Sequence, residues 1–408
     1  MNIIFGRIFA LLCNEVTFLN SFPLPLISRC FCNGFLFMAM KITEHIKIKI
    51  NSSLLGWFEQ YQRPMPWRET SDPYKIWIAE VMLQQTQVNT VEPYFHRFIL
   101  IFPTVQSLAE ADIHRVMKAW EGLGYYSRAR HLHAASRQMM SRFQGMIPDN
   151  LTDLLSLPGI GRYTAGAILS IAFGKPAPVL DGNVIRVLTR VFHVTDNIDK
   201  AITRKVLWEL AERLLPKDNI RSFNQALMEL GALICKPVNP NCSICPLLSV
   251  CQASKLRLQA MLPVRSPRKP VPHYDVTAGV IWKANRLLIT LRPPKGLLGG
   301  LWEFPGGKVK PKETLEACLK REIMEELNLK VDIKFHLISV KHAYTHFKIT
   351  LHAFECQYQN GHIRKDPDAI DDFRWIAASE LDQYAFPGAD RKVITAIYKK
   401  HHIQGDAP

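Results

Sequence analysis

Four cysteines lie close together past the middle of the chain, and they limit its possible folds more than any other feature. Their spacing is Cys235-x6-Cys242-x2-Cys245-x5-Cys251, while the other five cysteines are scattered. Thiols grouped in this way are typical of metal ligands in a reducing compartment and not of a disulfide framework. Zinc and an iron-sulfur cluster both bind four thiolates, and the spacing alone does not distinguish between them.

The length and charge of the chain set broader limits. With 408 residues and 48% hydrophobic content, the chain can bury more than one core, so we expect two domains. The formal net charge is +15, and most of the basic excess falls within residues 41–262. A basic balance of this size suits a polyanionic partner such as nucleic acid, but it says nothing about the fold.

The periodicity of the hydrophobic residues predicts an all-helical first domain. Residues 41–262 alternate helical periodicity with short polar turns, and no segment there has a convincing strand pattern. Two of the expected helices are 50–61 and 74–88. Residues 263–273 are rich in proline and basic side chains, which predicts an extended linker.

The pattern beyond the linker changes to that of strands. Residues 274–402 predict a mixed α+β domain with one central helix. The expected strands are 276–282, 287–292, 335–340 and 347–356.

The two ends of the chain fit neither domain. Residues 1–40 are apolar and rich in phenylalanine, and residues 403–408 form a short tail. The apolar run 3–13 is too short to span a bilayer and lacks the features of a signal peptide. We interpret residues 1–40 as the product of an upstream start codon, with the working protein beginning at Met38 or Met40. A membrane anchor or a targeting peptide is the alternative.

A glycine-rich turn at residues 157–163 leads into a segment of helical composition. It reads Leu-Pro-Gly-Ile-Gly-Arg-Tyr and includes Gly159 and Gly161. Backbone amides at such a helix start can bind a phosphate closely without reading the base sequence. For a turn of this kind in isolation, simple packing between two helices is the more common explanation.

Two acidic residues are candidates for chemistry. Glu80 lies among apolar residues of the expected helix 74–88, where burial would raise its pKa and keep it protonated, as a general acid requires. Asp181 begins another helix, either as an ordinary N-cap or as a carboxylate facing a sugar cation. The turn 122–130 adds Tyr125 and Arg128, which suit insertion between bases and contact with phosphates, although a capped helix with surface arginines is equally possible.

These motifs together resemble the helix-hairpin-helix DNA glycosylases, the superfamily that includes endonuclease III. The glycine-rich turn, Asp181 and the four-cysteine run carry this resemblance, which covers nearly everything after Met40. Glu80-Val-Met-Leu-Gln-Gln-Thr and the segments 122–130 and 179–186 are similar to the MutY-type adenine DNA glycosylases. The lyases of the superfamily carry a Lys where this chain has Tyr163, so the resemblance implies a monofunctional enzyme that forms no Schiff base.

The resemblance also implies individual roles. Glu80 would protonate adenine and Asp181 would stabilise the sugar cation, while Tyr163 and Asn183 would orient the sugar and Asp181. The four cysteines would hold a [4Fe-4S] cluster. Arg68 and Gln225 would line the base pocket. Gln85 and Tyr125 would fill the gap in the base stack. The DNA phosphates would be bound by Gly159, Gly161 and Arg128.

The second domain carries a further motif. Gly307-x5-Glu313-x7-Arg321-Glu322 and the residues after it resemble the Nudix box of MutT-type hydrolases, except that Asn328 replaces the usual Gly. Glu322, Glu325 and Glu326 share one helix face and could hold Mg²⁺, unless they are simply a solvated acidic face.

The resemblance implies that this second domain reads a damaged base. The segment 342–346 is similar to an element of the adenine DNA glycosylases that contacts 8-oxoguanine. Within it Tyr344 would intercalate and Thr345 would hydrogen-bond the damaged base, with His346 beside them.

The expected protein is therefore a helical glycosylase domain with a cluster loop at 235–251, followed by a Nudix-like α+β domain. Its expected substrate is duplex DNA containing adenine opposite 8-oxoguanine or guanine. We expect a monomer that works in a bacterial cytoplasm and binds no membrane. The alternatives are a glycosylase-lyase of the endonuclease III kind, residual hydrolysis of oxidised nucleotides by the Nudix box, and a lesion-binding protein without activity.

Overall fold

The computed structural model describes residues 42–267 and 270–402. The expectations for residues 1–40 and 403–408 lie outside these ranges. The described residues from Asn51 onward belong to one large compact unit. Across the described residues, no helix is both long enough and apolar enough to cross a membrane.

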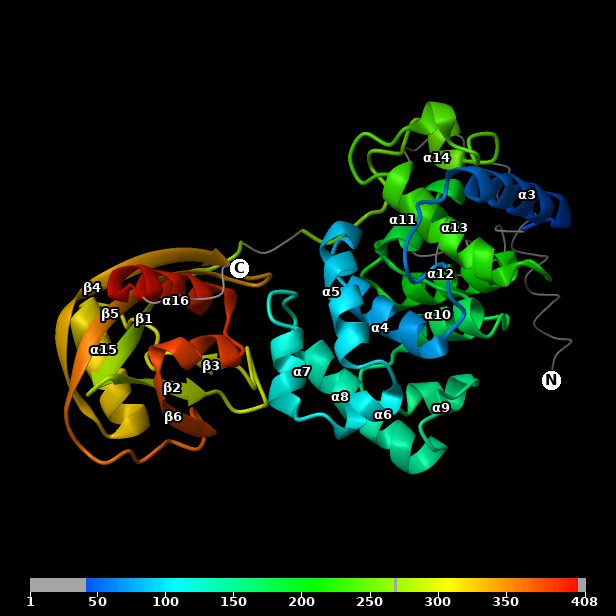
Figure 1. The fold of residues 1–408 in the computed structure, drawn as a ribbon. Helices are drawn as coiled ribbons and strands as arrows, with labels where there is room; N and C mark the ends of the chain where they lie inside the picture. Colours follow the sequence, from blue (N-terminus) through cyan, green and yellow to red (C-terminus); the bar gives the residue numbers. More distant parts are fainter. Residues whose placement is uncertain (1–41, 268–269, 403–408) are drawn as a thin grey trace, which may run out of the picture. The chain divides into compact units, whose positions relative to one another are not determined.

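The described part of residues 42–267 is helical and contains no strand, which confirms the all-α expectation (Figure 1). The elements are α3 (Glu44–Tyr61), α4 (Pro73–Leu83), α5 (Val88–Ile101), α6 (Val105–Glu110), α7 (Ile113–Ala119), α8 (Ser127–Phe143), α9 (Leu151–Leu155), α10 (Arg162–Ala167), the π-helical turn η1 (Ile168–Ala172), α11 (Gly182–Val191), α12 (Ala201–Leu214), α13 (Ile220–Leu233), the 3₁₀ turn η2 (Cys242–Ile244) and α14 (Gln252–Lys255).

Helix α4 is the buried centre of this helical region. Asp72 caps its first turn by accepting a hydrogen bond from the Tyr74 amide, and Pro73 occupies the first helical position. Eight of its 11 residues are buried, and Glu80 is the only charged residue among those eight. The chain therefore places one carboxyl group inside an otherwise apolar helix environment, where its charged form is costly.

The expected helix 74–88 is shorter than predicted. Helix α4 ends at Leu83, and a new helix begins at Val88. Between them Gln85 has a φ of 60°, a left-handed backbone that no helix interior contains. The apolar periodicity continues across the break, so the sequence pattern did not reveal it.

Helices α11 and α13 approach each other closely at Gly231. A Cβ atom at this position would lie 2.6 Å from the Cβ of Asn183. Because any larger residue would clash there, Gly231 allows the start of α11 to pack against α13.

The described part of residues 270–402 forms one six-stranded mixed sheet with two helices. The strand order is β3-β2-β1-β5-β4, with β6 paired to β2. The β1–β5 pair is parallel, and the other pairs are antiparallel. The elements are β1 (His273–Lys283), β2 (Arg286–Leu291), β3 (Trp302–Glu303), α15 (Leu315–Leu327), β4 (Lys330–Ala343), β5 (Lys348–Asn360), β6 (Asp372–Ala377), the 3₁₀ turn η3 (Ala378–Gln383) and α16 (Gly388–His401).

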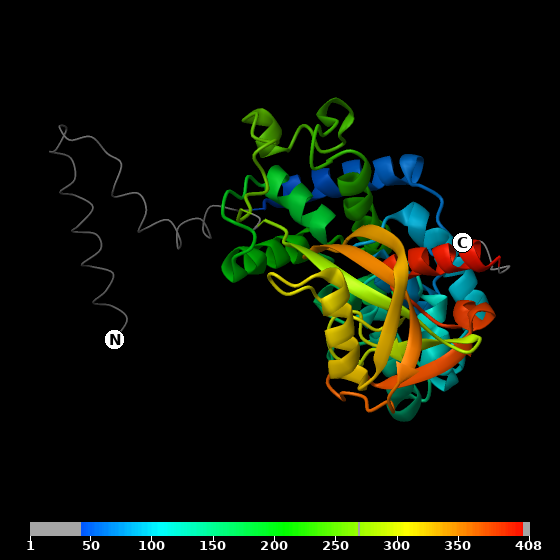
Figure 2. The ribbon, with the colours of Figure 1, turned by 90° about the vertical axis from the view of Figure 1, so that its left-hand side faces the viewer.

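Both faces of this sheet are covered, whereas the sequence predicted one central helix. Ile281 and Leu288 pack with α15, while their neighbours Val280 and Ile289 pack with α16. Since successive strand residues point to opposite faces, α15 and α16 lie on opposite sides of the sheet (Figure 2). The α+β class is confirmed, with α16 as an additional layer.

The departure from the Nudix box at Asn328 has a local explanation. Asn328 follows the last turn of α15 with a φ of 55°, in the left-handed region. Asparagine tolerates this conformation better than most side chains, so it can replace glycine at the end of a helix.

Candidate active site

Two carboxyl groups from distant parts of the chain line the same cavity in the helical region. Glu80 comes from α4, and Asp181 from the start of α11. The cavity has a volume of about 310 Å³, and Tyr163, Asn183, Arg68 and Gln225 also line it. The structure thus brings together all six residues that the sequence had assigned to catalysis and to the base pocket.

Glu80 is held as a carboxyl group with an unusually high proton affinity. Its side chain is 5% exposed, and the Tyr163 hydroxyl donates a hydrogen bond to its Oε2 at 2.6 Å. Burial, with a smaller contribution from the negative charge of Asp181, outweighs this hydrogen bond and raises the pKa of Glu80 to about 7. Near neutral pH Glu80 can therefore both release and accept a proton.

Asp181 is fixed by the helix that it begins. Its Oδ1 accepts a hydrogen bond from the Val184 amide at 2.7 Å, as an N-cap does, and its Oδ2 accepts one from Asn183 Nδ2 at 2.8 Å. Burial raises the pKa of Asp181 despite these bonds. Both oxygens are held in place, so this carboxylate can face a positive charge without moving.

An ion-pair network that the sequence did not reveal lies beside the cavity. Glu229 on α13 is 2% exposed and pairs with Arg63 at 2.7 Å and Arg68 at 3.0 Å. Burial alone would raise the pKa of Glu229, but hydrogen bonds from Arg63 and Arg68 lower it to about 2. Glu229 therefore orients Arg68 at the cavity wall. The only signal in the sequence was an acid within an apolar helical run, because its partners lie more than 160 positions away.

The residues expected to act on the DNA stack or its phosphates are mostly exposed. Gln85 and Tyr125 both have left-handed backbones and accessible side chains. Gly159, with a φ of +76°, and Gly161 lie in the exposed turn between α9 and α10. These four positions are compatible with contact to DNA.

The assignment of Arg128 to DNA phosphate was wrong. Its side chain is buried, and burial lowers the pKa of its guanidinium to about 10. It donates hydrogen bonds to the carbonyls of Val81, Met82 and Gln84 at 2.6–2.9 Å, and also binds the turn before α8. Arg128 therefore closes the end of α4, because it satisfies carbonyls that the broken helix leaves without partners.

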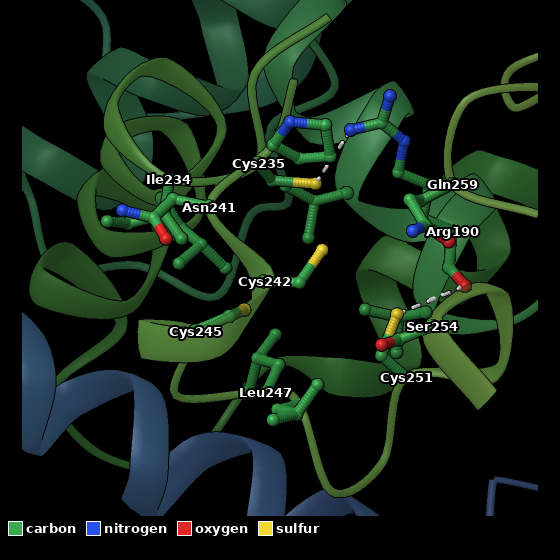
Figure 3. A pocket seen from close by; sticks show the side chains of 15 residues that line it. Arg190, Ile234, Cys235, Asn241, Cys242, Cys245, Leu247, Cys251, Ser254 and Gln259 are labelled. Atoms are coloured by element: carbon green, nitrogen blue, oxygen red, sulfur yellow. Dashed lines mark hydrogen bonds between the residues drawn. The ribbon is translucent and has the colours of Figure 1, made fainter. Parts of the chain in front are cut away.

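The four cysteines of the 235–251 loop line one pocket next to α11 and α13. Figure 3 shows their side chains around a common space. Arg190 is 2% exposed there and donates to Cys235 Sγ at 3.4 Å and to the carbonyls of Lys236 and Leu262. In the described ranges, no three His, Cys, Asp or Glu side chains form a group that could hold a single metal ion.

A second arginine of α11 connects this loop to the cavity. Arg186 donates to the Cys235 carbonyl at 2.6 Å and to Asn183 Oδ1 at 2.8 Å. Asn183 in turn donates to Asp181, so the cysteine loop and the cavity carboxylate share one chain of hydrogen bonds.

The three glutamates of the Nudix-like helix lie beside a basic side chain. Arg321 pairs with Glu322 at 2.7 Å and Glu325 at 3.0 Å, and it also binds Glu313. Glu326 lines a cavity of the sheet region together with Glu322, where burial, and then the charges of Glu303 and Glu322, raise its pKa to about 8. A guanidinium thus pairs with two of the three carboxylates, and their role in holding Mg²⁺ stays a prediction.

The segment 342–346 lies at the turn between β4 and β5. Thr345 and His346 are exposed there. Tyr344 is stacked on Phe347 with the ring centroids 4.7 Å apart, and it packs edge-on against His342. The intercalation of Tyr344 stays a prediction, and it would require the ring to leave these contacts.

Comparisons with known proteins agree with this geometry. Residues 78–213 match the HhH-GPD superfamily of base excision DNA repair proteins, and residues 277–396 match the NUDIX domain. The chain is 35% identical to the adenine DNA glycosylase of Homo sapiens, covering 84% of this chain and 72% of that protein. It is 37% identical to the adenine DNA glycosylase of Buchnera aphidicola, covering 73% of this chain and 84% of that protein.

A helical base excision repair domain with a buried acid, followed by a Nudix-like sheet domain, defines a DNA glycosylase of the helix-hairpin-helix superfamily. The identity extends over most of the chain and includes both domains. The chain belongs to the adenine DNA glycosylase family.

Arg128→Lys tests the structural role of this arginine. A lysine cannot reach all the carbonyls that Arg128 binds, so we expect the free energy of unfolding to fall by about 3 kcal/mol. Arg137→Lys, an exposed position on the same helix, should change it by less than about 0.5 kcal/mol. Urea denaturation measures both. Unchanged stability with a loss of DNA affinity would restore the phosphate-binding assignment.

Proposed function

We propose that this protein hydrolyses the N-glycosidic bond of adenine that is paired with 8-oxoguanine or guanine in duplex DNA. The observation that carries the proposal is the placement of Glu80 and Asp181 on one cavity, with the pKa of Glu80 raised to about 7. The removal of a base requires an acid whose pKa lies near neutral pH and a carboxylate that is fixed in place.

The chemical step can be written with these residues. The target nucleotide leaves the base stack and its adenine enters the cavity. Protonated Glu80 donates its proton to a ring nitrogen of adenine, and the C1′–N9 bond breaks with its electron pair leaving on the base. Asp181 stabilises the cation that forms on the sugar. Water then attacks C1′ and loses its proton to the Glu80 carboxylate.

The surrounding residues would serve binding and orientation. Tyr163 holds Glu80 by a hydrogen bond, and Asn183 holds Asp181. Arg68 and Gln225 line the cavity where the base would lie. Outside the cavity, Gln85 and Tyr125 would fill the gap in the stack, Gly159 and Gly161 would bind phosphate, and Thr345 and His346 would contact the damaged base.

The cysteine loop supports a [4Fe-4S] cluster over zinc. Four thiols surround one space, and their Cys-x6-Cys-x2-Cys-x5-Cys spacing is similar to that of the endonuclease III superfamily, whose cysteines hold such a cluster. When bound, the cluster would supply a rigid crosslink for the loop, and Arg190 would donate to its thiolate ligand Cys235.

The alternative activities have less support. Tyr163 provides no amine for the Schiff base of a lyase. Hydrolysis of nucleotides by the Nudix-like domain would require its glutamates to bind a metal, and Arg321 already pairs with two of them.

A single-turnover assay tests the proposed reaction. The protein should release adenine from a duplex with adenine opposite 8-oxoguanine and should leave thymine opposite guanine intact. Glu80→Gln, which keeps the shape of the side chain but has no proton to donate, should lower the rate by at least about a hundredfold while duplex binding persists. Unchanged release by this variant would remove Glu80 from the reaction, and release of thymine alone would contradict the substrate.

The pH dependence of the same rate tests the ionisation of Glu80. Because the acid must be protonated, the rate should decline as the pH rises through about 7. The hydrogen bond from Tyr163 lowers the pKa of Glu80, so Tyr163→Phe should move this decline to higher pH. Tyr61→Phe, at an exposed tyrosine, should leave the profile unchanged. A decline at the same pH in Tyr163→Phe would contradict the assigned hydrogen bond.

Metal analysis tests the cysteine loop. The purified protein should contain about four iron and four sulfide ions per chain and show visible absorption from the cluster. Cys242→Ala should lose most of the iron, whereas Cys356→Ala, at a buried cysteine of the sheet, should keep it. One zinc ion per chain with no iron would show that the loop is a zinc site.

A further inference from the structure

A methionine sulfur contacts the group that holds the catalytic acid. Met228 lies on α13 and lines the cavity of about 310 Å³. Its Sδ is 3.2 Å from the hydroxyl oxygen of Tyr163, and that hydroxyl lies 2.6 Å from Glu80 Oε2. One hydroxyl proton therefore faces two acceptors, and the carboxyl oxygen takes it because a thioether is a weak acceptor.

We propose that Met228 is a modification site, where oxidation of its thioether to the sulfoxide by a peroxide switches off base release. This inference rests on the proposed glycosylase function, since it concerns regulation of the same cavity. It makes the enzyme responsive to the oxidants that form the lesion opposite its target base.

Peroxide can reach this sulfur. Met228 is only partly buried, and its side chain faces a cavity large enough to admit a nucleobase. Met65, Met82, Met117 and Met139 are each at most 4% exposed, whereas Met146 and Met261 are 67% and 70% exposed. Oxidation should therefore reach Met146 and Met261 first, Met228 next and the core methionines last.

The modification step is a transfer of one oxygen atom. The sulfur lone pair attacks one oxygen of hydrogen peroxide, a sulfur–oxygen bond forms and the oxygen–oxygen bond breaks. The departing hydroxide takes the proton left on the transferred oxygen, giving water and a neutral sulfoxide. The sulfur loses two electrons, and the peroxide gains them.

The product changes the cavity in two ways. A sulfoxide oxygen is polar and accepts hydrogen bonds, unlike the thioether that it replaces. It competes for the single proton of the Tyr163 hydroxyl, so Glu80 loses the bond that positions it. The added oxygen also occupies space in the cavity, where the adenine ring would lie.

The test compares oxidised and untreated full-length holoenzyme. Protein with its cluster is treated with hydrogen peroxide, quenched with catalase and mapped by mass spectrometry, and visible absorption confirms that the cluster persists. Single-turnover release of adenine opposite 8-oxoguanine should fall about tenfold once Met228 is oxidised, because the acid loses the hydrogen bond that positions it. Methionine sulfoxide reductases should restore it.

Three variants test the role of this sulfur. Met228→Leu has no sulfur at this position, so peroxide treatment should not change its rate of adenine release. Met261→Leu should lose as large a fraction of its rate on treatment as the wild type does. Met228→Gln carries an amide oxygen near the position of the sulfoxide oxygen and should be slow without any oxidant.

Three results would overturn the proposal. These are an unchanged rate when Met228 is fully oxidised, an equal fractional loss in Met228→Leu, and the absence of sulfoxide at Met228 once the exposed methionines are fully oxidised. The untreated wild type distinguishes a failure of the proposed glycosylase function from a failure of the proposed modification site. If it releases no adenine, the proposed function fails, whereas release that survives oxidation of Met228 counts only against this site.

Discussion

The close approach of two carboxyl groups away from bulk water is the constraint on which the rest of this enzyme depends. Glu80 is enclosed by the apolar residues of α4, and the charge of Asp181 adds to the cost of ionising it. In water two such groups would both be ionised at neutral pH. In the shared cavity the two groups have different roles. Glu80 can act as an acid, and Asp181 is held in place as a helix cap.

The scaffold keeps these groups in place from several directions. Arg128 closes the end of α4 just beyond Glu80, and Gly231 lets α13 pack against the start of α11. Arg186 joins Asn183 to the cysteine loop through hydrogen bonds. Hydrogen bonds thus connect the cysteine loop to the start of α11 and to Asp181. A change in the loop would therefore alter the position of Asp181.

The sequence predicted the helical and sheet regions and six of the residues that line the cavity, because their motifs are local and resemble those of a known superfamily. It failed where a contact joins distant segments. Glu229 pairs with arginines more than 160 positions away, and Arg128 turns inward to carbonyls that only the broken end of α4 exposes. The glutamates of the Nudix-like helix were correctly placed on one helix, but their pairing with Arg321 was not visible from the spacing.

The proposed reaction depends on the raised pKa of Glu80, and this side chain can be titrated directly. Selective ¹³C labelling of glutamate carboxyl groups, with Glu80→Gln used to assign the signal, would give the pKa by NMR or by difference infrared spectroscopy. The structure predicts a value of about 7 in the free holoenzyme. A value near 4.5, the ordinary pKa of a solvated glutamate, would contradict the account.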